Sequence, residues 1–303
     1  MLKAKQLKTK EDDAITQPFI TATNYDGAGE GQTVLLLGRV HGNEPSGEIA
    51  IRRVMGEIES GQIKITKGRV ICIPEVNAAA KMTDKRFTDR NLNRVMGLND
   101  PIDNEGRIAE QLRPFLDQAD YLLDLHSYTV GGPPFAFASD DGVTMAFARA
   151  VRPAAIITGW NDCFVRTFPD AEAPGMGTTE YARAKGATAI TFECGQHKDL
   201  NAHEAGYQAI INALRHVGVV EGVVSAPGRD AIPHYRMEHI FMKDEEGTLA
   251  ETWRHLQPVH EGQVFATFQD GRVLRFPQDG VVILPNVSAG VQAEWGYMGV
   301  RVV

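Results

Sequence analysis

The hydrophobic residues of this chain form short continuous apolar runs separated by longer stretches of mixed polarity. Continuous runs of this kind are typical of strands that are covered on both faces. The runs lie at residues 33–40, 69–77, 120–126, 154–158 and 188–193. Apolar residues repeat at helical spacing in the stretches between and after them, at residues 46–59, 105–118, 143–151, 179–185 and 199–217. Alternating strands and helices predict an α/β fold with a mixed, mostly parallel sheet flanked by helices.

The pattern changes after Gly222. From residue 234 onward the apolar runs are short, and closely spaced glycines separate them, as in a small all-β module. The intervening segment at residues 225–233 has the composition of a linker. We therefore expect a catalytic α/β domain at residues 1–224 and a small β-rich domain at residues 225–303. Residues 78–104 and 159–178 are read as long loops, which in a compact domain usually carry function or are disordered.

Composition narrows the functions that are possible. The formal net charge is −8, which argues against nucleic-acid and anionic-membrane partners because both need a basic surface. No apolar stretch approaches the length of a membrane span, and no signal peptide is visible at the N-terminus. The three cysteines, Cys72, Cys163 and Cys194, lack metal-binding spacing and are an odd number. We expect a cytoplasmic protein with reduced cysteines.

Four residues with metal or proton chemistry follow three of the predicted strands. His41 and Glu44 follow the first, His126 ends another, and Glu193 ends a third. Ligands of open α/β sheets bind outside the carboxyl ends of the strands. A catalytic zinc takes three His or carboxylate ligands, and a further carboxylate is needed to move protons. We therefore expect His41, Glu44 and His126 to bind zinc beside Glu193, with Asp124 on the same strand face as His126.

Each of these signals has a plainer structural reading. A single histidine at a strand end is more often a hydrogen-bonded structural residue, and Cys194 is more often a core residue than a nucleophile. The basic loop at residues 86–94 could be a solvated surface segment. Guanidinium groups also suit carboxylates and developing oxyanions, so beside a zinc site the same loop would hold substrate. The signals taken together, rather than any one of them, favour a catalytic site over a structural role for these residues.

The motifs together resemble the succinylglutamate desuccinylase and aspartoacylase family, within the wider zinc-carboxypeptidase superfamily. They are HGNE at residues 41–44, RFTDRNLNR at 86–94, DLH at 124–126 and FECG at 192–195. The resemblance covers nearly the whole chain, including the C-terminal β module. It implies a zinc-carboxypeptidase-like fold with one zinc ion per chain, bound by the three residues predicted above.

The resemblance also implies a role for each residue around the metal. Glu193 would act as general base and then as general acid. Arg86 would polarise the scissile carbonyl and stabilise the oxyanion, while Asn93 and Arg94 would hold a substrate carboxylate. The implied reaction is hydrolysis, by a zinc-activated water, of the amide bond of a small N-acyl amino acid.

Two positions depart from the family pattern. Asn91 stands where the family often has Asp, and Glu180 follows Thr178-Thr179 where aspartoacylases carry Arg. If Glu180 faces the pocket, the site has lost a cation and gained an anion. Neutral or amine-bearing substrates, such as an N-acetyl diamino acid, would then replace N-acetylaspartate and succinylglutamate. The alternative is that Glu180 faces solvent on its helix, and the sequence leaves both open.

Two other functions compete with the deacylase. A zinc carboxypeptidase acting on short peptides would use the same metal and base, but a C-terminal module that narrows access favours a small substrate. A non-catalytic binding protein on the same fold would be free to lose Glu193. The sequence leaves open whether the chain forms a homo-oligomer. It also leaves open whether Trp295 or Tyr297 reaches the site, although aromatic residues there more often belong to the core.

Overall fold

The computed structural model describes residues 20–168, 175–222 and 232–302. Its helices are α2 (Pro45–Glu59), α3 (Ala78–Met82), η1 (Leu92–Arg94), α4 (Asn104–Leu116), α5 (Gly142–Ala150), α6 (Trp160–Thr167), α7 (Thr178–Ala184) and α8 (Leu200–Val217). Its first strands are β1 (Thr23–Asp26), β2 (Gly29–Gly38), β3 (Lys67–Ile73), β4 (Tyr121–Tyr128), β5 (Phe135–Phe137), β6 (Ala155–Thr158) and β7 (Thr188–Gln196). The C-terminal strands are β8 (His234–Met242), β9 (Gly247–Leu249), β10 (Pro258–Val259), β11 (Val264–Phe268), β12 (Val273–Arg275), β13 (Gly280–Ile283) and β14 (Glu294–Arg301).

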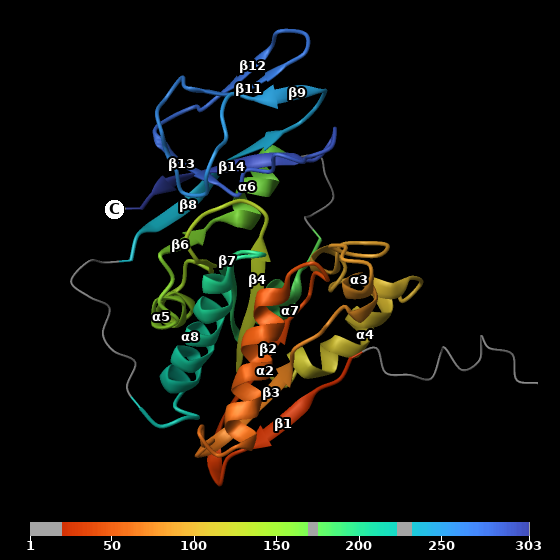
Figure 1. The fold of residues 1–303 in the computed structure, drawn as a ribbon, viewed down its shortest axis with the longest axis vertical. Helices are drawn as coiled ribbons and strands as arrows, with labels where there is room; N and C mark the ends of the chain where they lie inside the picture. Colours follow the sequence, from red (N-terminus) through yellow and green to blue (C-terminus); the bar gives the residue numbers. More distant parts are fainter. Residues whose placement is uncertain (1–19, 169–174, 223–231, 303) are drawn as a thin grey trace, which may run out of the picture.

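One sheet of eleven strands runs through most of the molecule, in the order β1-β3-β2-β4-β7-β5-β6-β8-β14-β13-β10. Strands β3, β2, β4 and β7 are parallel to one another, whereas β1 and β5 pair antiparallel with their neighbours in this group. A separate small sheet has the order β12-β11-β9. The predicted fold class, a mixed α/β sheet with helices and a small β part, is confirmed (Figure 1).

The large sheet continues from the α/β part into the C-terminal strands. Strand β6 pairs in parallel with β8, and β8 pairs with β14, so no break in hydrogen bonding separates the two parts. The predicted boundary between residues 224 and 225, and most of the predicted linker, lie outside the described residues. The division into two domains stays a prediction. None of the helices in the described part of the chain is long and apolar enough to cross a membrane.

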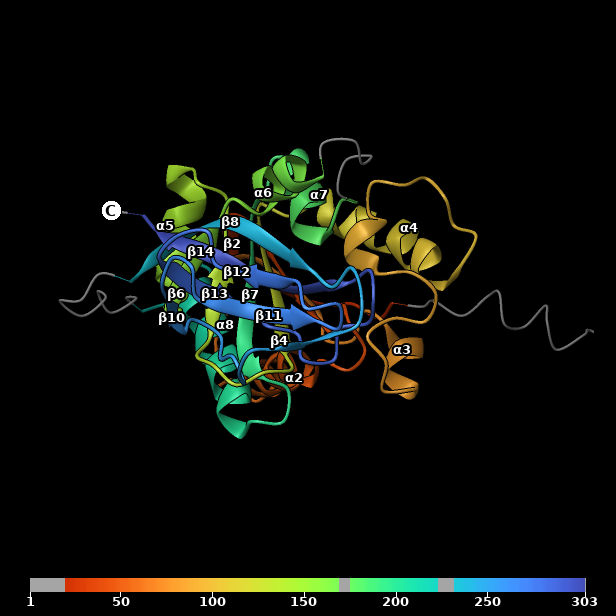
Figure 2. The same cartoon turned by 90° about the horizontal axis from the view of Figure 1, so that it is seen from above.

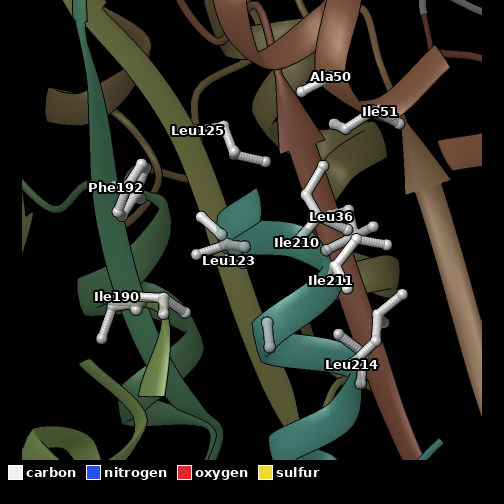
Figure 3. Packing of buried hydrophobic residues seen from close by; sticks show 14 of the residues in the cluster. Leu36, Ala50, Ile51, Leu123, Leu125, Ile190, Phe192, Ile210, Ile211 and Leu214 are labelled. Carbon is white, nitrogen blue, oxygen red and sulfur yellow. The ribbon is translucent and has the colours of Figure 1, made fainter. Parts of the chain in front are cut away.

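Strand β2 shows why the apolar runs fold as they do. Val34 and Leu36 point into a core formed with α2 and α8, whereas Leu35 and Leu37 point into a second core on the opposite face. Side chains alternate between the faces of a strand, so a strand covered on both faces must be apolar throughout. Figure 3 shows the first core, where residues of α8 such as Ile210 pack against the strands.

Three expectations about the helices need correction. The segment at residues 159–178, expected as a loop, contains α6, a short helix that buries Cys163. The expected loop at residues 78–104 contains α3 and η1. In α2, Ile49 belongs to the apolar repeat expected over residues 46–59 but is 41% exposed, whereas Ile51 is fully buried. Helix α2 packs both on the sheet and on α8.

The parallel strands β2, β4 and β7 end at the same edge of the sheet. In Figure 1 the C-terminal strands lie above this edge, and in Figure 2, which views the molecule from above, β8, β13 and β14 cross over the α/β part. A pocket of about 360 Å³ lies between the two, lined by residues of both parts. The predicted site residues lie around this pocket.

Candidate metal centre and active site

The turn after β2 carries His41 and Glu44 and is tightly held. Arg39 takes a left-handed backbone conformation with φ of 52°. Its guanidinium donates to the carbonyl of Gly42 and, over 2.5 Å, to the carboxylate of Glu48. A Cβ atom at Gly42 would lie 2.2 Å from the backbone of Ala80, so only glycine fits this turn. The glycine of the HGNE motif is therefore explained by packing.

The structure brings the three predicted zinc ligands together. His41 Nδ1 lies 3.0 Å from Glu44 Oε1, and His126 Nδ1 lies 2.8 Å from Glu44 Oε2. The two Nδ1 atoms are 3.1 Å apart. All three side chains are buried. Residues from two strand ends thus converge on one small, enclosed volume.

The far sides of the two imidazole rings face hydrogen-bond acceptors. Nε2 of His41 lies 3.0 Å from Oδ1 of Asn91, and Nε2 of His126 lies 3.0 Å from Oδ2 of Asp124. Both Nδ1 atoms lie beside the carboxylate of Glu44, on the side of the rings away from these acceptors. Nε2 of His126 has no hydrogen-bond partner among the described residues, so its contact with Asp124 is a charge interaction rather than a hydrogen bond. Two imidazole nitrogens and a carboxylate fit a zinc ion. Asp124 lies beside His126, as its place on the same strand face predicted.

Charges around these residues also fit a cation. Burial, reinforced by the Arg86 guanidinium, lowers the pKa of His41 to about 4. Burial alone would raise the pKa of Glu44, but His41, Arg86 and His126 outweigh it and hold that pKa well below its ordinary value. Burial likewise opposes charge on His126, yet the carboxylates of Asp124 and Glu44 raise its pKa well above the ordinary value. A metal ion would displace the proton that these carboxylates attract to His126.

Glu193 lies beside the three ligands but not among them. It is the direct register partner of His126 on the neighbouring strand, and it lines the pocket. Its Oε2 atom is buried and has no hydrogen-bond partner among the described residues. Burial raises the pKa of Glu193 to about 8, which suits a group that accepts and returns a proton near neutral pH. Cys194, on the opposite strand face, is a core residue.

Arg86, Asn93 and Arg94 of the basic loop all line the pocket. Arg86 donates to Glu44 Oε1 over 2.5 Å, and Asn93 Oδ1 accepts from the backbone N–H of Thr178 over 3.2 Å. Arg94 forms no ion pair with a carboxylate in the described part of the chain, and its guanidinium lies 5.5 Å from the centre of the Trp160 ring. Arg94 is therefore available to bind an anionic group of a substrate.

Glu180 also lines the pocket, so it does not face solvent alone. Its carboxylate lies 2.8 Å from Arg183 on the same helix and accepts from the backbone N–H of Gly177 over 3.2 Å. Arg183 lines the pocket too. The negative charge of Glu180 is thus balanced by the positive charge of Arg183. A direct role of Glu180 in substrate binding stays a prediction.

Among the pocket residues, Trp160 was not identified from the sequence and Tyr297 was left open. Trp160 begins α6, in the segment expected to be a loop, and Tyr297 reaches the pocket from β14. Their rings meet edge to face with centres 5.1 Å apart, and burial raises the pKa of Tyr297. Trp295, two residues earlier, belongs to the core. The sequence signal for Tyr297 was present in the C-terminal aromatic pair, but strand register alone decides which ring reaches the site.

Comparisons with known proteins agree with this geometry. Residues 30–217 match the family model described as the succinylglutamate desuccinylase/aspartoacylase catalytic domain. An N-alpha-acetyl-L-2,4-diaminobutyric acid deacetylase from Halomonas elongata is 29% identical over 262 residues, which are 80% of this chain and 72% of the relative.

Solved structures share the fold. A succinylglutamate desuccinylase/aspartoacylase from Rhodobacter sphaeroides superimposes with a TM-score of 0.76 at 23% identity, covering 94% of this chain and 89% of the other. The product-bound ectoine utilization protein EutE from Ruegeria pomeroyi gives a TM-score of 0.72 at 21% identity, covering 92% and 88%.

Proposed function

Because the chain belongs to the succinylglutamate desuccinylase/aspartoacylase family, we propose that it is a zinc-dependent amidohydrolase. It cleaves the amide bond of a small N-acyl amino acid. The observation that carries this proposal is the convergence of His41, Glu44 and His126 beside a carboxylate, Glu193, that has a free buried oxygen. Structural residues would not need both features in one pocket.

The three ligands would hold the metal through His41 Nδ1, His126 Nδ1 and the carboxylate of Glu44. When bound, zinc supplies a Lewis acid that polarises the substrate carbonyl and lowers the pKa of water to near ~7. Asn91 and Asp124 orient the two imidazole rings from behind through their contacts with Nε2. This arrangement leaves the pocket side of the site for water and substrate.

Glu193 moves the protons of the reaction. Its free Oε2 atom accepts a proton from the attacking water and donates it to the leaving nitrogen, which makes the amine a good leaving group. Arg86 presents its guanidinium at the pocket beside Glu44, where it stabilises negative charge on the carbonyl oxygen. Asn93 and Arg94 hold the carboxylate of the amino-acid part.

The walls of the pocket favour a small substrate. Arg236, Leu284 and Tyr297 from the C-terminal part close the space above the site, and about 360 Å³ suits an acyl amino acid better than a peptide. The cytoplasmic location expected from composition is consistent with such a metabolite and stays a prediction.

We further propose that the preferred substrate carries an amine, as in an N-acetyl diamino acid. The relative from Halomonas elongata is named for such a substrate. Three carboxylates besides Glu193 line the pocket, at Asp140, Asp162 and Glu180. Glu180 and Asp162 are paired with arginines, whereas Asp140 is exposed and forms no ion pair within the described residues. Asp140 is therefore the acid most available to an ammonium group.

A substrate panel with metal analysis tests the proposal. We expect about one zinc per chain and turnover of acetylated amino acids, fastest for those with an amine in the side chain. Turnover of short peptides instead would favour the carboxypeptidase. Absence of zinc, or absence of turnover after zinc reconstitution, would favour the non-catalytic binding protein. An Asp140→Asn variant should lose the preference for the amine while keeping hydrolysis of neutral substrates.

A further inference from the structure

Glu105, in the first turn of α4, is a fully buried carboxylate outside the pocket. It lies behind the basic loop and accepts hydrogen bonds from three successive backbone N–H groups. These come from Thr88 at 2.8 Å, Asp89 at 3.0 Å and Arg90 at 3.2 Å. The Thr88 hydroxyl and the Asn77 amide each donate over 2.9 Å. One carboxylate thus gathers the backbone of residues 88–90 around itself.

Electrostatics show that this carboxylate is charged. Burial alone would raise the pKa of Glu105, but the N–H groups of residues 88–90 and Asn77 outweigh it and lower the pKa to about 2. Asp89 and Asp103 lie close enough for the three acids to resemble a metal site. N–H and O–H donors already occupy both oxygens of Glu105, so its charge is balanced by hydrogen bonds and needs no ion.

The loop on either side of residues 88–90 touches the proposed metal ligands. Before them, Arg86 donates to Glu44, and the carbonyl of Arg86 accepts from the N–H of Gly42 over 3.1 Å. After them, Asn91 contacts Nε2 of His41 over 3.0 Å. The side chains at residues 84–89 are exposed, so apolar burial contributes little to holding this stretch. Hydrogen bonds to Glu105 hold this stretch, together with the ion pair of Arg90 with Asp103 and the hydrogen bond from the N–H of Asn104 to Asp89.

We propose that Glu105 is a positioning residue for the reaction. By fixing the backbone of residues 88–90, it keeps Arg86 against Glu44 and Asn91 against His41. Glu105 itself does not line the pocket, so it acts only through the loop. This inference depends on the proposed deacylase function for its catalytic part, but its structural part can be measured in the metal-free protein.

Hydrogen exchange tests the structural part. Glu105→Gln keeps the shape of the side chain but directs an NH₂ group toward N–H donors. We expect the amides of residues 88–90 to exchange about tenfold faster or more in this variant. Leu112→Ala is the control, because Leu112 is fully buried on the same helix in the second core and its side chain cannot accept the hydrogen bonds of residues 88–90. Equal exchange at residues 88–90 in wild type and Glu105→Gln would overturn the proposal.

A double-mutant cycle tests the catalytic part in the zinc-loaded enzyme. Glu105→Gln should lower kcat about tenfold with little change in KM, and Leu112→Ala should leave kcat within about twofold. In an Arg86→Ala background the further loss from Glu105→Gln should be clearly smaller than tenfold, because part of the effect of Glu105 passes through Arg86. Fully multiplicative losses would overturn the proposal.

Two other results, a Glu105→Gln variant that does not fold and a wild type without deacylase activity, can be told apart from a failure of this proposal. If Glu105→Gln does not fold, Thr88→Val removes a single donor to Glu105 and should give the same pattern with smaller changes, whereas no change at residues 88–90 would overturn the proposal. If wild type has no deacylase activity, the proposed function fails. The exchange measurement then still decides whether Glu105 holds the loop.

Discussion

A change at Glu48 provides a quantitative test of how the turn that carries His41 and Glu44 is held. Glu48 is buried in the first turn of α2 and accepts hydrogen bonds from Arg39, Arg52 and Lys81. Burial alone would raise its pKa, but these cations outweigh it and lower the pKa from 4.5 to about 2. Because the folded pKa lies below the unfolded value, the charged carboxylate stabilises the fold above pH 4.5. That stabilisation is lost as the pH falls toward 2.

The size of the effect follows from the same difference in pKa. A change from 4.5 to about 2 corresponds to about 3 kcal/mol at 25 °C. The side chains of Arg52 and Lys81 are 53% and 32% exposed, so solvent screens their contribution. We therefore expect Glu48→Gln to lower the free energy of unfolding at pH 7 by about 1–2 kcal/mol.

Urea unfolding of the metal-free proteins between pH 7 and pH 3 measures this. The difference between wild type and Glu48→Gln should shrink as the pH falls below 4.5, because Glu48 then binds a proton in the unfolded chain while it stays charged in the folded protein. Val54→Ala, at a fully buried position of the same helix, is the control and should give a difference that does not depend on pH. A Glu48→Gln difference that stays constant over this range would refute the electrostatic reasoning.

The remaining predictions concern turnover. Glu193→Ala should keep zinc, measured by metal analysis, and lower kcat about 10²- to 10⁴-fold; loss of zinc would show that Glu193 is a ligand. Arg86→Ala should mainly lower kcat by about 10²-fold or more, whereas Arg94→Ala should mainly raise KM, and steady-state kinetics that show the reverse would exchange their roles. Glu180→Arg should shift preference from basic toward acidic acyl amino acids in competition assays. An unchanged preference would remove Glu180 from substrate selection.

The convergence of the proposed metal ligands could be predicted from the sequence because these residues occupy the simplest positions in the fold. His126 ends an apolar run that had to be a strand covered on both faces, and Glu193 ends another. The carboxyl ends of adjacent parallel strands meet at one edge, so their side chains converge whatever the loops do. The pairing of His126 with Glu193 follows from that geometry. The pattern of apolar runs was therefore enough to predict that His126 and Glu193 lie side by side.

The walls of the pocket could not be found in the same way. Trp160 begins a helix of eight residues, too short for a periodic pattern to be recognised within a Gly- and aromatic-rich segment. The pairing of Glu180 with Arg183 follows from their spacing of three residues on α7, but which side of that helix faces the pocket is a tertiary property. Glu105 gave no signal, because a carboxylate in the first turn of a helix is common for reasons of the helix dipole. Only the structure shows that the backbone of residues 88–90 surrounds Glu105.

The residues proposed for the chemistry and the residues of the pocket walls lie in different parts of the fold. The match to the family model ends at residue 217 and includes the three proposed ligands and Glu193, but not Arg236, Leu284 or Tyr297. His126 and Glu193 stand on strands buried on both faces, and His41 and Glu44 lie in the turn that follows another such strand, so a change of backbone position there would disturb two cores. Trp160, Glu180 and Tyr297 of the walls stand on α6, α7 and β14, and Asp140 lies in the loop between β5 and α5. Family membership therefore supports the amide hydrolysis, whereas the role proposed for wall residues such as Asp140 in the choice of substrate is a separate prediction.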